Sequence, residues 1–153
     1  MRGQGRALPA MALAAMSLIP GAPNRVAWRG TITTAAGLTG SFRTRTHLFV
    51  SRDGETAEYR GRFRCRGPGC TLRHGHIGVV PAYGFPRPPS IDLVIFGARH
   101  PTTLNCYVDN QPHQPPNFDI QGKYTCDTVV PPEPPPVRRF SEGTLSLMRW
   151  ARP

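Results

Sequence analysis

Arginine recurs at every second position in two stretches of the chain, and this spacing would place the side chains on one face of a β-sheet. The first stretch contains Arg43 and Arg45, and the second contains Arg60, Arg62 and Arg64. A guanidinium group offers forked hydrogen-bond donors that match the geometry of phosphate, sulfate or carboxylate groups. These arginines are therefore the candidate anion-binding residues of the protein.

The two stretches form the arms of one predicted β-hairpin over residues 40–65. Asp53-Gly54 is a dipeptide that a two-residue type I′ turn prefers, so the sequence predicts that turn at the tip. This register pairs Val50 with Ala57 and places His47 among the arginines. A slip of one residue would put arginines into the core. The predicted inward residues are Phe42, Thr44, Thr46, Leu48, Val50, Ala57, Tyr59, Gly61, Phe63 and Cys65.

The hairpin register has an electrostatic cost. Arg45 would oppose Arg62 and Arg43 would oppose Arg64, and like charges directly opposite destabilise a sheet by roughly 0.2 to 1 kcal/mol per pair. The net charge is +10. Lys123 is the only lysine, and the chain is rich in proline, glycine and alanine. GC-biased codon usage would give the same composition, so it is a second explanation for the excess of arginine. A solvated outer face with compositional arginine thus remains the alternative to a binding site.

The N-terminal residues 1–23 have the pattern of a secretory signal peptide. Arg2 and Arg6 precede an apolar run over residues 7–19, which ends at Pro20-Gly21. A misassigned start or a retained amphipathic anchor is the alternative. We expect an exported protein, periplasmic or extracellular, with one all-β domain over residues 24–153. Nucleic acid is not expected as its partner.

The cysteines support an oxidising compartment, because an even number in an exported chain predicts disulfides. Four cysteines allow three pairings. We favour Cys65 with Cys70, across a tight turn, and Cys106 with Cys126, at inward positions of two strands. A zinc site is excluded by spacing, since the chain contains no Cys-x-x-Cys.

Short alternating segments with glycine and proline between them continue along the chain. They predict strands over residues 26–34, 70–80, 91–96 and 143–150, together with strands around Cys106 and Cys126. Gly75 and Gly78 suggest a bulge in the second of these. The proline-rich segment 129–137 is predicted to be a loop. The fold class is all-β, a small antiparallel barrel of about eight strands or a sandwich.

The two ends of the chain resemble those of calycin-type barrels such as lipocalins. The resemblance lies in Trp28 with Gly30 on the first strand and in Gly143-Thr144 leading to Arg149 on the last. It implies a closed barrel in which the late arginine covers the first-strand tryptophan. Segments 122–126 and 143–147 also resemble the closing hairpin of small exported bacterial barrels, which implies the compartment.

Three function classes follow from these patterns. The first is a non-catalytic binding module that contacts an anionic polysaccharide or lipid surface through the arginines. The second is a carrier that holds a small apolar ligand inside the barrel. The third is a structural protein. The predicted cavity residues of the carrier are Trp28, Tyr59, Phe63 and Ile95.

Catalytic and metal sites have little support in the sequence. It contains no nucleophile elbow, no His-Glu-x-x-His and no phosphate-cradling glycine loop, so we expect no enzyme and no cofactor. His74 and His76 share one strand face and could form half of a metal site. No third ligand is evident unless the fold brings His100 or His113 beside them, and we predict no metal.

Overall fold

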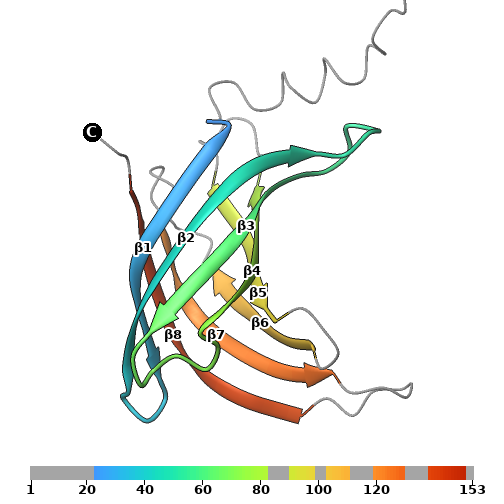
Figure 1. The fold of residues 1–153 in the computed structure, drawn as a ribbon. Helices are drawn as coiled ribbons and strands as arrows, with labels where there is room; N and C mark the ends of the chain where they lie inside the picture. The colour runs from blue at the N-terminus through green and yellow to red at the C-terminus, as the bar shows by residue number, and fades with distance from the viewer. Residues whose placement is uncertain (1–22, 83–89, 99–102, 111–118, 130–137, 151–153) are drawn as a thin grey trace, which may run out of the picture.

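The protein is a closed antiparallel barrel of eight β-strands (Figure 1). The computed structural model describes residues 23–82, 90–98, 103–110, 119–129 and 138–150. Each strand pairs with its neighbour in sequence, and β8 pairs with β1 to close the barrel. This architecture confirms the all-β fold class and the predicted number of strands. The strands are β1 Arg25–Thr34, β2 Thr39–Val50, β3 Ala57–Arg66, β4 His74–Ala82, β5 Ser90–Gly97, β6 Thr103–Asn110, β7 Ile120–Val129 and β8 Arg138–Arg149.

The register of the β2–β3 hairpin is confirmed, but the predicted turn at its tip is wrong. Val50 pairs with Ala57, as expected. The Ser51 amide then donates to the Thr56 carbonyl at 2.9 Å, which leaves a four-residue loop over 52–55. A four-residue and a two-residue loop centred on the same dipeptide give the same pairing, so the error in turn type does not change the faces.

Asp53 organises this loop through its carboxylate. The carboxylate accepts hydrogen bonds from the Glu55 amide at 3.1 Å and from the Ser51 hydroxyl. These bonds lower the pKa of Asp53, with the Ser51 hydroxyl as the largest contributor. Gly54 takes a φ of 73°, a left-handed conformation that glycine adopts without steric cost. Side-chain acceptance at Asp53 thus accounts for a wider loop than the dipeptide alone predicts.

The barrel interior holds a cluster of aromatic rings. Phe42 on β2 stacks on Phe63 on β3 with centroids 4.9 Å apart. Phe96 on β5 meets both rings edge-on at 5.4 Å. Alternate residues of β2 are buried and exposed, because successive strand side chains point to opposite faces. The buried hydroxyls of Thr44 and Thr46 each donate to a backbone carbonyl at 2.9 Å, so both buried polar groups have a hydrogen-bond partner.

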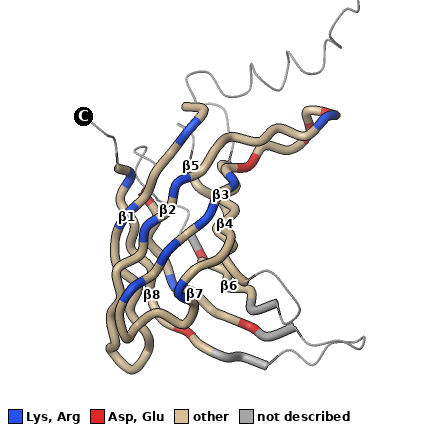
Figure 2. Tube along the Cα trace, viewed as in Figure 1, with Lys and Arg blue, Asp and Glu red and all other residues tan. Residues whose placement is uncertain are grey.

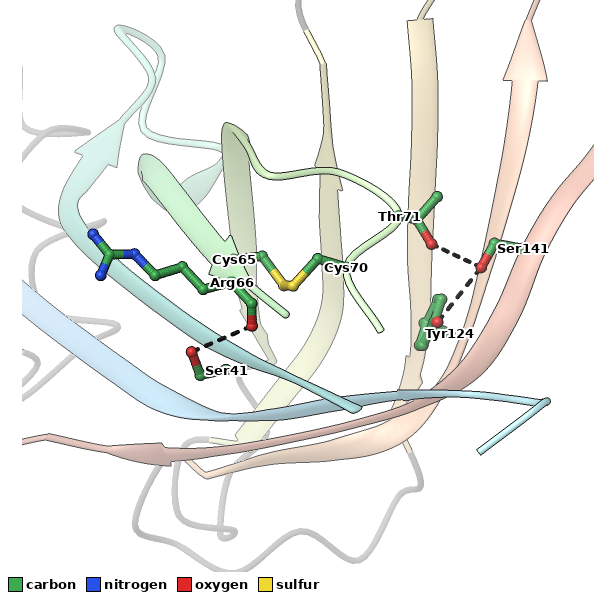
Figure 3. The surroundings of a disulfide bond; sticks show 7 residues. All are labelled: Ser41, Cys65, Arg66, Cys70, Thr71, Tyr124 and Ser141. Carbon is green, nitrogen blue, oxygen red and sulfur yellow. Dashed lines mark hydrogen bonds between the residues drawn. A yellow bond between two sulfur atoms is a disulfide. The ribbon is translucent and has the colours of Figure 1, made fainter. Parts of the chain in front are cut away.

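Both predicted disulfides form. Cys106 and Cys126 lie directly opposite each other on β6 and β7, fully buried, with their Cα atoms 3.9 Å apart. The second disulfide, between Cys65 and Cys70, closes the connection from β3 to β4 (Figure 3). This connection also packs against β2, since the Gly69 amide donates to the Thr39 carbonyl at 2.9 Å. The Cys65 end of β3 is therefore fixed to the start of β2.

The boundaries of β4 differ from the prediction. The strand begins at His74 rather than at Cys70, because residues 67–70 form a turn that the disulfide between Cys65 and Cys70 closes. Its irregularity lies between Val80 and Pro81 and not at the predicted glycines. Proline lacks the amide hydrogen that a regular ladder requires, which explains the shift.

Some predicted features lie outside the described residues. These are the signal peptide over residues 1–22 and segment 130–137 of the proline-rich loop. No helix that is long and apolar enough to cross a membrane occurs in the part of the chain that the structure describes.

Candidate functional site

The predicted anion-binding arginines lie together on the outer surface of the barrel. Arg43 and Arg45 on β2 and Arg60, Arg62 and Arg64 on β3 are all exposed. Their positions alternate with the buried positions of the same strands, so the apolar interior fixes which way they point. Figure 2 shows the basic residues along the neighbouring strands β1, β2 and β3.

Three further arginines join this surface and were not included in the sequence prediction. Arg25 and Arg29 are exposed on β1, where Arg29 pairs with Arg43, and Arg66 is exposed at the end of β3. The alternation of Arg29 with the buried Trp28 is visible in the sequence, but the pairing of β1 with β2 was needed to place it. We call the following set the arginine face: Arg25, Arg29, Arg43, Arg45, Arg60, Arg62, Arg64 and Arg66.

Two histidines extend the basic surface onto β4. His74 pairs with Arg64, and His76 pairs with Arg62. The sequence offered these histidines as half of a metal site, with His100 or His113 as a further ligand. His100 and His113 lie outside the described residues, and no group of three or more metal-ligating side chains occurs among the residues described. The observed surroundings of His74 and His76 are cationic.

One acidic side chain, Glu58, belongs to strands β1 to β4 as the structure describes them. Its Oε2 accepts a hydrogen bond from Arg60 Nε at 2.7 Å. The guanidinium of Arg60 also lies 3.9 Å from the centre of the Phe49 ring. Arg60 is thus held by a charge partner and by a cation–π contact. The residue is the least available of the arginine face for an added anion.

The other arginines of the hairpin face one another without a counter-charge. Arg43 pairs with Arg64 and Arg45 pairs with Arg62, and none of the four makes an ion pair within the described part of the chain. Neighbouring strands lie about 4.8 Å apart, so opposing guanidinium groups share the same solvent region. Clustered charges of one sign produce a local potential that favours ligands of the opposite sign, here anions.

Two hollows open on this surface. The first, of about 400 Å³, is lined by four arginines of three strands together with apolar and small polar residues. Its lining includes Arg29, Ser41, Arg43, Arg64, Arg66 and Met148. The second, of about 590 Å³, lies over β3 to β6 and is bordered by Arg60, Arg62 and His76. The arginine face therefore has a recess at each side.

One of the four residues predicted to line an internal cavity, Ile95, does not face the interior, so this part of the prediction is wrong. Ile95 pairs with Gly78 and with Tyr107 on the outer face and lines the larger hollow. It alternates with the buried Val94 and Phe96, and the nearly continuous apolar sequence of β5 concealed this alternation. The prediction assigned Ile95 to the interior because an apolar run gives no period from which to read the faces.

The remaining cavity residues are interior and closely packed. Trp28, Tyr59 and Phe63 are at most 1% exposed, and the Trp28 ring meets the Tyr59 ring edge-on with centroids 6.0 Å apart. The Tyr59 hydroxyl donates to the Pro23 carbonyl at 3.0 Å. Burial raises the pKa of Tyr59, and the positive charge of Arg149 partly counters this. These side chains contribute to the core of the barrel.

Comparisons of the chain with protein-family models, with curated proteins and with solved structures gave no match.

Proposed function

We propose that this protein is an exported, non-catalytic binding module that docks onto anionic polysaccharide of the cell envelope through its arginine face. The observation that carries the proposal is the set of arginines on three consecutive strands with Glu58 as the acidic residue among them. Docking is electrostatic, and its free energy comes largely from the release of counterions from the polymer.

The shape of the barrel favours a flexible polymer over a planar membrane. The arginines and the two histidines occupy β1 to β4, which are half of the strands in a closed barrel. A surface that covers so much of a barrel is convex, and a flat bilayer would touch only part of it. A linear polysaccharide can follow the curvature and contact several strands at once.

Export is supported by the two disulfides, because such bonds persist in oxidising compartments. A calycin-like architecture is supported by the closed barrel and by the direct pairing of Trp28 with Arg149 at the seam between β1 and β8. The carrier function that lipocalins suggest receives no comparable support, since the aromatic residues named for a cavity pack against one another.

The proposal is tested by retention of the protein on heparin over a salt series. Arg45→Ser with Arg62→Ser removes two charges from the centre of the arginine face. A matched control, Arg52→Ser with Lys123→Ser, removes two charges from the hairpin loop and from β7. We expect the first variant to elute at clearly lower salt than the wild type, and the control to elute close to it.

Equal losses in the two variants would contradict the proposal, because net charge and not the arginine face would then govern retention. Vesicles that contain phosphatidylglycerol provide the second arm. Binding to vesicles without retention on heparin would identify a lipid surface as the partner and would also contradict the polysaccharide proposal.

A further inference from the structure

The smaller hollow on the arginine face has the features of a discrete site within a broad surface. Four arginines line it: Arg29 from β1, Arg43 from β2, and Arg64 and Arg66 from β3. No carboxylate is among its lining residues as the structure describes them. The site is therefore a recess of about 400 Å³ that is bordered by four arginine side chains.

The strand register explains why these arginines lie next to one another. Arg29, Arg43 and Arg64 form one row across three strands, since Arg43 pairs with both of the others. Arg66 belongs to the adjacent row, where it pairs with Ser41. The row spacing along a strand is about 6.7 Å and the spacing between strands is about 4.8 Å. Guanidinium groups at these spacings can contact one small anion from different sides.

Local contacts hold the two ends of the recess. The Arg29 guanidinium lies 5.4 Å from the centre of the Trp150 ring, a cation–π contact at the β8 side. Arg66 directly follows Cys65, whose disulfide to Cys70 fixes this end of β3 (Figure 3). The side chain of Arg29 and the backbone of Arg66 are thus restrained before any ligand binds, which reduces the entropy lost on binding.

Ser41 adds a hydroxyl group to the lining. Its Oγ lies 3.5 Å from the Arg66 carbonyl oxygen, at the long limit of a hydrogen bond. The hydroxyl can therefore turn to donate to a bound oxygen at little cost. Met148 supplies an apolar contact on the β8 side, where it pairs with Arg29. The recess thus combines charge, a neutral donor and an apolar wall.

We propose that this recess binds a phosphomonoester group of the polysaccharide and selects it over a carboxylate. A phosphomonoester carries a charge of roughly −1.5 to −2 and three acceptor oxygens. A carboxylate carries one charge and two oxygens in one plane, which one arginine can satisfy in bidentate fashion. Four arginines around one recess are more than a carboxylate can use, and their guanidinium groups can surround a tetrahedral dianion. This inference rests on the proposed function and names the group that the polymer presents.

The test compares two polymers and two variants at constant ionic strength. Phosphorylated mannan presents phosphomonoesters, and polygalacturonate presents carboxylates. The hollow variant is Arg29→Gln with Arg66→Gln, and the matched control is Arg45→Gln with Arg62→Gln, which removes the same charge from the face outside the hollow. We expect the hollow variant to lose about tenfold or more in affinity for phosphorylated mannan relative to the control.

For polygalacturonate we expect both variants to weaken binding by a similar factor, which also shows that the hollow variant is folded. Free mannose 6-phosphate should compete with phosphorylated mannan for the wild type and less well for the hollow variant. Equal losses in the two variants on both polymers would overturn the inference and leave the arginine face as a general polyanion surface. If the wild type binds neither of the two polymers, the proposed function itself is overturned.

Discussion

Arg43 on β2 lies directly opposite Arg64 on β3, and both side chains are exposed on the same face of the barrel. Arg43 also pairs with Arg29 on its other side. Like charges in directly opposite positions destabilise a sheet. The fold therefore carries an electrostatic cost at the residues to which we assign binding, a pattern that is common where function competes with stability.

Replacing the central arginine of this row should stabilise the free protein. We expect Arg43→Thr to raise the free energy of unfolding by about 0.5 to 1 kcal/mol at low salt, because two like-charge pairs are removed. The gain should disappear in about 1 M salt, where the screening length is near 3 Å. Urea denaturation at the two salt concentrations measures this. Arg60→Thr is the control and should not raise the free energy of unfolding, since Arg60 forms an ion pair with Glu58. A salt-independent gain would refute the electrostatic explanation.

The two aromatic residues Phe63 and Phe49 test the assignment of the hairpin faces. Phe63 is 1% exposed and contacts two other rings, so Phe63→Ala should cost about 3 to 5 kcal/mol of unfolding free energy. Phe49 is 44% exposed and touches Arg60, so Phe49→Ala should cost at most about 1 kcal/mol. Thermal or chemical denaturation gives both values. Similar costs for the two substitutions would mean that the register is shifted.

The disulfides should differ in their contribution to stability. The bond between Cys106 and Cys126 spans 20 residues, and that between Cys65 and Cys70 spans 5. Loop-closure entropy then predicts a loss of about 3 kcal/mol when the first is replaced by a pair of alanines and about 2 kcal/mol for the second. Denaturation of the two double variants measures the difference. A larger loss for Cys65 and Cys70 would show that the β3–β4 connection contributes more than chain entropy.

Tyr59 should make the fold sensitive to alkaline pH. Its folded pKa is raised above the ordinary value of 10.0, mainly by burial. In the unfolded chain the phenol loses its proton at lower pH than in the barrel. The stability contribution is thus fully present below about pH 10 and is lost as the pH rises through the folded pKa. Unfolding free energies between pH 8 and pH 11 should fall less steeply in Tyr59→Phe. Identical slopes would exclude Tyr59 as the responsible group.

The sequence predicted the features that depend on alternation within a strand. The inward and outward faces of the β2–β3 hairpin follow from the arginines and aromatic residues of that segment alone. Both disulfides were predicted correctly because the sequence near each pair indicated the partner. Cys65 and Cys70 flank a tight turn, and Cys106 and Cys126 occupy inward positions of their strands. Strand number followed from the spacing of the short segments.

Features that depend on pairing between distant segments could not be predicted in the same way. The row formed by Arg29, Arg43 and Arg64 requires the register of β1 on β2 as well as that of β2 on β3. The recess additionally requires Met148, which pairs with Arg29 only because β8 closes the barrel. Ile95 was misplaced because residues 93–96 of β5 are all apolar, so no polar side chain marks the outer face in that part of the strand.

The central claim is that the arginine face binds polyanions, and the salt dependence of heparin affinity tests it most directly. Dissociation constants for the wild type should rise steeply with salt, and the slope of log affinity against log salt reports the number of anionic groups contacted. Arg45→Ser with Arg62→Ser should lower the magnitude of that slope by about 1 to 2, at roughly 0.7 to 0.9 per lost contact. The control Arg52→Ser with Lys123→Ser should leave the slope unchanged. A shallow wild-type slope that neither double substitution alters would contradict the account.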